Sequence, residues 1–73
     1  VFEIGCNDGR FLEALRKRGA TALVGVEPNA VSSEIARKRG LEVHCDMVSP
    51  AICAGAVARH GRFDLVVSRQ VLE

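Results

Sequence analysis

Short apolar runs alternate with longer amphipathic segments along the 73 residues of the chain. The apolar runs have the length of strands and cover residues 1–4, 22–26, 41–45 and 63–68. Between them, apolar positions recur at helical spacing over residues 9–18, 28–39 and 50–60. Strands that alternate with helices favour right-handed crossovers and a parallel sheet. The pattern therefore predicts an α/β fold.

The helical segments have distinct inner faces and ends. We expect the inner faces to consist of Phe11, Leu12 and Leu15, of Val31, Ile35 and Ala36, and of Ile52, Ala56 and Val57. Two basic runs, residues 16–18 and 37–39, precede Gly19 and Gly40. Cations in a last turn oppose the negative end of the helix dipole, and glycine suits the left-handed residue that follows. We interpret these runs as solvated helix ends and not as nucleic-acid contacts, because Trp and Tyr are absent.

The turn after the first apolar run carries the candidate chemistry. Residues 1–9, Val-Phe-Glu-Ile-Gly-Cys-Asn-Asp-Gly, lead an apolar strand into a glycine loop, and Glu27 ends the next strand. Glycines let a ligand approach the backbone, and an acid at a strand end grips two ribose hydroxyls. The pairing of this loop with Glu27 predicts a nucleoside pocket.

Two common nucleotide-binding spacings do not fit this loop. The dinucleotide motif G-x-G-x-x-G needs glycine where Asn7 and Arg10 stand, and the P-loop needs glycine and lysine where Arg10 and Phe11 stand. The remaining pattern, E-x-G-x-x-x-G, lacks the spacing that places a pyrophosphate on a helix N-terminus. A ligand with ribose and adenine but without phosphate fits better, and we expect S-adenosylmethionine.

Three segments resemble motifs of the class I S-adenosylmethionine-dependent methyltransferases and occur in the same order as in that family. They are residues 3–9, 24–28 and 63–73. The resemblance implies a Rossmann-like β-α-β-α-β-α-β unit with parallel strand order 3-2-1-4. It also implies that residues 1–73 are the first half of a catalytic domain, truncated at both ends. The pair Asn7-Asp8 is similar to the sugar C-methyltransferases, which act on nucleotide-linked keto-deoxysugars.

The resemblance implies a set of cofactor-binding residues: Glu3, Gly5, Cys6, Asn7, Gly9, Glu27, Pro28, Asp46, Met47 and Ser68. Glu27 would take the ribose hydroxyls, and the two glycines would surround the methionine half. Glu3 would reach the cofactor amino group or pair with a helix residue. Asp46 would bind the adenine amino group, and Met47 would pack on the ring.

Asp8 has a different expected role, because a carboxylate beside a helix start accepts bonds from free backbone N–H groups. No catalytic base is assignable. Arg69 and Gln70 follow the fourth strand, on the side where a substrate should meet the methyl group. Methylation of carbon needs a base that removes a proton next to a carbonyl. The related enzymes usually place a His after the position of Glu73 and other candidates further on.

Composition sets broad limits on partners and compartment. The net charge of +1 gives no general attraction to nucleic acid or membrane. No apolar stretch approaches the roughly 20 residues needed to span a bilayer, and nothing resembles a signal peptide. Cys6, Cys45 and Cys53 form no C-x-x-C pair, so we interpret them as reduced thiols and not as metal ligands. We expect a cytoplasmic enzyme with a small-molecule substrate, and the oligomeric state stays open.

Three other functions remain open. A class I methyltransferase with an oxygen or nitrogen acceptor would share the same cofactor half. A nicotinamide-dependent dehydrogenase domain is disfavoured by the missing middle glycine. A domain that binds cofactor without catalysis, or binds nothing, is disfavoured by the intact Gly5, Gly9 and Glu27.

Overall fold

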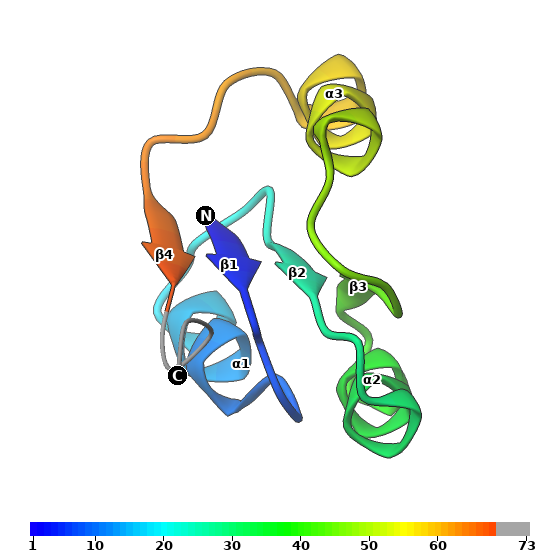
Figure 1. Ribbon diagram of the computed structural model, residues 1–73. Helices are drawn as coiled ribbons and strands as arrows, with labels where there is room; N and C mark the ends of the chain where they lie inside the picture. Colours follow the sequence, from blue (N-terminus) through cyan, green and yellow to red (C-terminus); the bar gives the residue numbers. More distant parts are fainter. Residues whose placement is uncertain (69–73) are drawn as a thin grey trace.

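A computed structural model describes residues 1–68, which form one parallel sheet flanked by helices (Figure 1). The elements in chain order are β1 (Phe2–Ile4), α1 (Arg10–Lys17), β2 (Val24–Val26), α2 (Ala30–Lys38), β3 (Glu42–His44), α3 (Pro50–His60) and β4 (Val66–Ser68). The strand order is β3-β2-β1-β4, and every pairing is parallel. The predicted α/β fold and its Rossmann-like strand order are therefore confirmed.

The two faces of the sheet carry separate apolar cores, because side chains alternate along each strand. One core lies under α1 and α2 and contains Cys6, Leu12, Ala36, Leu41 and Val43. The other lies under α3 and contains Phe2, Val24, Val26 and Ala56. Figure 1 shows α1 and α2 near each other and α3 on the opposite side of the strands. The sheet is thus the middle layer of a three-layer fold.

The strands are shorter than predicted, and each spans three residues. Ala22 has a φ of 52°, which interrupts the extended conformation expected from residue 22. The ladder of β2 therefore begins at Val24, which pairs with Phe2. Ahead of β4, Phe63 lies outside the ladder, and its ring packs edge-on against Phe2 at 5.5 Å between centroids. Apolar residues thus extend beyond the regular strand in both places.

The inner face of α2 differs from the prediction. Val31 and Ile35 are 71% and 43% exposed, whereas Ser33 and Ala36 are buried. Small side chains are needed here because α2 packs closely on the glycine loop. The buried Ser33 hydroxyl donates to the Ala30 carbonyl, so its burial leaves no unmet hydrogen bond.

The inner face of α3 is also shifted from the prediction. Ile52 and Ala56 face the core as expected, and Cys53 packs beside them. Val57 is exposed, contrary to the expectation. Cys53, on the same helix, therefore packs against the core where Val57 was expected to do so.

The helix ends follow the sequence closely. α1 and α2 end at Lys17 and Lys38, and Gly19 and Gly40 have φ values of 93° and 85°. Asp8 stands just before α1, and its Oδ1 accepts a hydrogen bond from the backbone N–H of Arg10, the first helical residue. The predicted helix ends are confirmed. Asp8 accepts from a free N–H of the first turn as expected, but the N-cap residue of α1 is Gly9 and not Asp8.

Two further features concern the surface. β4 is an edge strand of the described sheet, and its first residue Val66 and the preceding Leu65 are exposed. Within residues 1–68, no helix combines the length and apolar character that crossing a membrane requires.

Gly9 is the tightest contact between the glycine loop and α2. Its φ is 84°, and a Cβ there would lie 2.6 Å from Leu41 Cδ1 and 3.0 Å from Ala36 Cβ. Gly19 has a similar φ but nothing within 4 Å of a Cβ. We expect Gly19→Ala to cost about 1–2 kcal/mol of unfolding free energy from the left-handed backbone alone. Gly9→Ala adds overpacking and should cost about 2–4 kcal/mol. Urea denaturation measures both, and equal losses would contradict a packing role for Gly9.

Candidate functional site

A pocket of about 370 Å³ opens at the carboxyl ends of β1, β2 and β3. Its lining residues are Ile4, Gly5, Asn7, Val26, Glu27, Pro28, Asn29, Ser32, Asp46, Met47 and Val48. They come from the loops that follow the three strands, together with the strand ends and the first turn of α2. Ligands of open α/β sheets bind at this edge. The structure thus brings six of the predicted site residues together around one cavity.

Glu27 is the central group of this pocket. Its Oε1 accepts a hydrogen bond from the Asn7 backbone N–H at 2.8 Å, and its Oε2 accepts one from the Asn29 backbone N–H at 2.9 Å. The Glu27 backbone N–H donates to the His44 carbonyl at 2.9 Å. A carboxylate has about four acceptor positions, so each oxygen keeps capacity for a further donor. Glu27 therefore fixes two loops and can still accept from a ligand.

The glycine loop turns sharply at the end of β1. Gly5 has a φ of 75°, and Asn7, at 55°, is one of the few non-glycine types that tolerate the left-handed region. The backbone N–H groups of Gly5 and Cys6 both donate to the Val26 carbonyl, at 2.8 and 3.1 Å. This turn leaves Gly5 and Asn7 in the pocket wall.

The loop after β3 forms a third wall. The Asp46 backbone N–H donates to the His44 carbonyl at 3.0 Å, and Asp46 Oδ1 accepts from the Met47 N–H at 2.7 Å. Met47 is 62% exposed and lies beside Val48 in the pocket lining. The loop therefore offers a carboxylate acceptor next to exposed apolar side chains.

Four predicted site residues lie outside this lining: Glu3, Cys6, Gly9 and Ser68. Glu3 is fully buried in β1, and Gly9 packs on α2. Ser68 is exposed at the end of β4, where it pairs in register with Ile4. A cofactor contact from any of the four stays a prediction. Arg69 and Gln70, expected near the substrate, lie outside the described residues.

Cys6 belongs chiefly to the core. Its side chain is 1% exposed and packs with Leu12. Burial, together with the nearby carboxylates of Glu3 and Glu27, raises the pKa of the Cys6 thiol to about 12. The thiol is therefore not a nucleophile at neutral pH. Cys6 also lies, with Asn7 and Phe11, beside a second hollow of about 360 Å³ on the other side of the loop.

Five pocket residues were not predicted: Ile4, Val26, Asn29, Ser32 and Val48. Ile4 and Val26 are the last residues of their strands. Their position at the carboxyl edge of the sheet could have predicted that they line the pocket. Asn29 is the N-cap of α2, and its side chain accepts from the Ser32 backbone N–H at 2.9 Å. An Asn immediately before a helix start is a sequence signal for an N-cap. No sequence feature indicates Val48.

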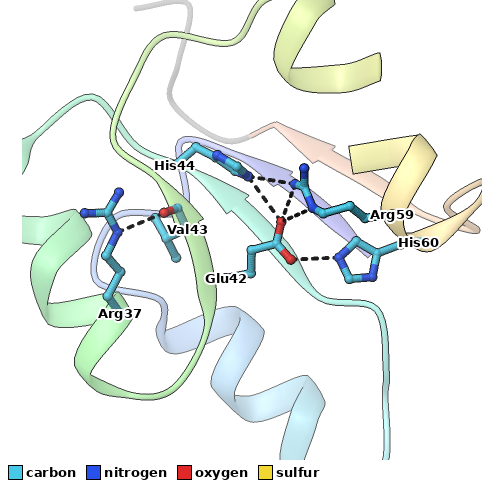
Figure 2. A network of polar contacts seen from close by, with 6 residues as sticks. All are labelled: Arg37, Glu42, Val43, His44, Arg59 and His60. Atoms are coloured by element: carbon cyan, nitrogen blue, oxygen red, sulfur yellow. Dashed lines mark hydrogen bonds and ion pairs between the residues drawn. The ribbon is translucent and has the colours of Figure 1, made fainter. Parts of the chain in front are cut away.

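A second polar cluster joins β3 to α3, and Figure 2 shows its members around Glu42. Glu42 Oε1 is 2.7 Å from His60 Nε2, and Glu42 Oε2 is 3.1 Å from Arg59 Nε and 3.2 Å from His44 Nε2. Another Arg59 nitrogen is 3.0 Å from His44 Nε2. None of these four residues is in the pocket lining. Because two of them end α3, the cluster anchors that helix to the edge of the sheet.

No metal-binding group is apparent in the part of the chain that the structure describes. Residues 1–68 contain no cluster of three or more His, Cys, Asp or Glu side chains in an arrangement that could hold a metal ion. The Glu42 cluster is accordingly best described as an ion-pair and hydrogen-bond network.

The Glu42 cluster generates a pH dependence of stability. Partial burial raises the pKa of Glu42, but hydrogen bonds from His60, Arg59 and His44 outweigh it and lower the pKa from 4.5 to about 2. The folded-state pKa is the lower one, so the ionised carboxylate stabilises the fold above pH 4.5, and this is lost as the pH falls towards 2. We expect Glu42→Gln to reduce the loss of unfolding free energy across that window.

Urea denaturation at a series of pH values measures this effect. Glu34→Gln is the matched control, because Glu34 is an exposed carboxylate of α2 that lies outside the cluster. The control should keep the wild-type slope of unfolding free energy against pH. A Glu42→Gln variant with the same slope as the control would contradict the assignment.

Comparison with known proteins places this architecture in a family. The model of a family described as "Methyltransferase domain" matches residues 1–73, the whole chain. A search of curated proteins finds no significant match. Since the family match covers every residue, and the sheet has the strand order that the resemblance implied, the chain belongs to the methyltransferase domain family.

Proposed function

We propose that the pocket binds S-adenosylmethionine and that the protein transfers the methyl group of this cofactor to a small molecule. Family membership supports methyl transfer in general. The observation that carries the cofactor proposal is the Glu27 carboxylate, which is held by two backbone N–H groups at the carboxyl end of β2. Ribose presents two adjacent hydroxyl donors, and this carboxylate presents two adjacent oxygens with remaining acceptor capacity.

The charge of the pocket also supports this cofactor. Among the described residues that line it, Glu27 and Asp46 are acidic, and none is Lys or Arg. A dinucleotide would bring a pyrophosphate into this acidic cavity without a cation to neutralise it. S-adenosylmethionine has no phosphate and carries a positive sulfonium. The acidic lining therefore favours S-adenosylmethionine over NAD.

The loop after β3 suits the base of the same ligand. The Asp46 carboxylate can accept from an adenine amino group, while Met47 and Val48 provide apolar surface for the ring. With Glu27 on the ribose, this arrangement directs the methionine half towards the glycine loop at Gly5 and Asn7. S-adenosylmethionine would supply an electrophilic methyl group, and the residues that line the pocket would bind and orient it for an acceptor.

For the acceptor, we propose a nucleotide-linked keto-deoxysugar that is methylated on carbon. The support is the Asn7-Asp8 pair in the loop, which is similar to the sugar C-methyltransferases. In the structure Asn7 lines the pocket, and Asp8 binds the start of α1 and the Arg10 side chain. A small-molecule acceptor with oxygen or nitrogen is the second candidate, because the cofactor residues would be the same.

Calorimetric titration of the intact protein tests the cofactor. We expect S-adenosylhomocysteine, the demethylated product, to bind and NAD to give no binding heat at the same concentrations. Tight binding of NAD without a response to S-adenosylhomocysteine would reject the proposal.

Substitution of Glu27 tests its assigned role. Glu27→Ala should weaken the binding of S-adenosylhomocysteine by roughly 1.5–3 kcal/mol, the range for hydrogen bonds to a charged group. Calorimetry gives the dissociation constant, and circular dichroism verifies that the variant is folded. Glu34→Ala removes an exposed carboxylate outside the pocket and serves as the control. A folded Glu27→Ala variant with an unchanged dissociation constant would remove Glu27 from the site.

A further inference from the structure

Arg39, the last residue of the second basic run, is not simply a solvated helix end. Its Nε donates to the Asp8 carbonyl at 2.9 Å, across 31 residues of sequence, in a partly buried hydrogen bond. Asp8 is part of the glycine loop that contributes Gly5 and Asn7 to the pocket wall. The end of α2 is therefore bonded directly to the loop.

The backbone of Arg39 is tied to α1 as well. Its carbonyl accepts from the Arg16 guanidinium at 2.5 Å, and the same guanidinium binds Glu13. Glu13 and Arg16 both belong to α1, which begins immediately after the loop. Arg39 thus contacts the loop with its side chain and the helix after the loop with its backbone. Arg39 can therefore fix the loop relative to α2.

The loop is held from two sides by groups of opposite charge. The Glu27 carboxylate accepts from the Asn7 N–H on the pocket side, and the Arg39 guanidinium donates to the Asp8 carbonyl from α2. Between these points the chain must keep Asn7 in the left-handed region, with a φ of 55°. A non-glycine residue in that region costs free energy, which the surrounding contacts have to offset.

We propose that Arg39 is a positioning residue for the pocket, which holds the glycine loop in the conformation that places Asn7 in the pocket wall. This inference rests on the function proposed above, because it gives Arg39 an effect on cofactor affinity. Loss of the bond removes the hydrogen bond that ties the Asp8 backbone to the end of α2, while the bonds on the β2 side remain. A smaller fraction of molecules then has the competent loop, and the apparent affinity falls in proportion to that fraction.

Substitutions at Arg39 separate the hydrogen bond from the charge and the bulk. Arg39→Gln places an amide nitrogen at the position of Nε, so it removes the charge and keeps a donor. Arg39→Met has similar length and no donor. Arg37→Met is the matched control, because Arg37 is also a cation at the end of α2, and its Nε donates to the Val43 carbonyl at 2.9 Å, away from the loop (Figure 2).

Hydrogen–deuterium exchange of residues 5–10 in the intact, ligand-free protein is the first readout, and the dissociation constant of S-adenosylhomocysteine is the second. Arg39→Met should accelerate exchange in the loop and weaken binding by about tenfold, which corresponds to the loss of 1.4 kcal/mol. Arg39→Gln should restore both values to near those of the wild type. Arg37→Met should leave both unchanged, whatever its effect on the melting temperature.

The inference is overturned if loop exchange in Arg39→Met equals that in Arg37→Met, or if Arg39→Gln fails to restore it. If the wild-type protein does not bind S-adenosylhomocysteine, the proposed function fails, while the exchange comparison still decides the role of Arg39. If Arg39→Met does not fold, Arg39→Lys replaces it, since lysine keeps the charge and has a methylene at the position of Nε. Faster loop exchange in the Lys variant than in the Gln variant would then support the inference, and the reverse would overturn it.

Discussion

Both oxygens of the Glu27 carboxylate accept backbone hydrogen bonds, one from Asn7 in the glycine loop and one from Asn29 at the start of α2. This single side chain therefore joins the ends of β1 and β2 and orients the helix that follows. Charge-assisted bonds of this kind are stronger than neutral ones and hold the carboxylate in one direction. Two walls of the pocket, the glycine loop and the segment before α2, are the segments that the Glu27 carboxylate connects. A ligand that binds Glu27 meets a site that is already organised.

The same constraint explains the packing behind the pocket. With the loop fixed by Glu27, Gly9 is pressed against α2, and only a small residue such as Ala36 fits opposite it. Arg39, at the end of α2, adds a hydrogen bond to the Asp8 carbonyl of the same loop. The loop is thus supported by small side chains and directed hydrogen bonds more than by bulky apolar groups. Substitutions behind the loop are accordingly expected to affect the pocket without touching a ligand.

Much of the fold could be predicted from the sequence, because the alternation of apolar runs and helical segments is regular. The resemblance supplied the strand order, and the position of Glu27 at a strand end located the pocket. The predicted inner face of α2 was wrong because hydrophobicity favours Val31 and Ile35, whereas Gly9 approaches α2 closely at the small residue Ala36. A close contact between two segments far apart in the sequence cannot be read from the hydrophobic pattern of either segment. The hydrophobic pattern also does not indicate the left-handed turn at Ala22, which shortens β2.

Only part of the site could be predicted, because some of its residues are placed by the backbone of the loop and not by the sequence pattern. Pro28 and Met47, which follow strand ends, were implied by the resemblance, and they line the pocket because all parallel strands end at one edge of the sheet. Within the loop, however, the backbone angles decide which residues face the cavity, and Cys6 faces the core. The family assignment rests on a match over the whole chain.

The crystal structure of the intact protein with S-adenosylhomocysteine tests the central claim most directly. We expect both ribose hydroxyls to donate to the Glu27 carboxylate, with Asn7 and Asn29 still bonded to it and the adenine ring beside Met47. A ligand bound elsewhere, or a ribose in this pocket without contact to Glu27, would contradict the account.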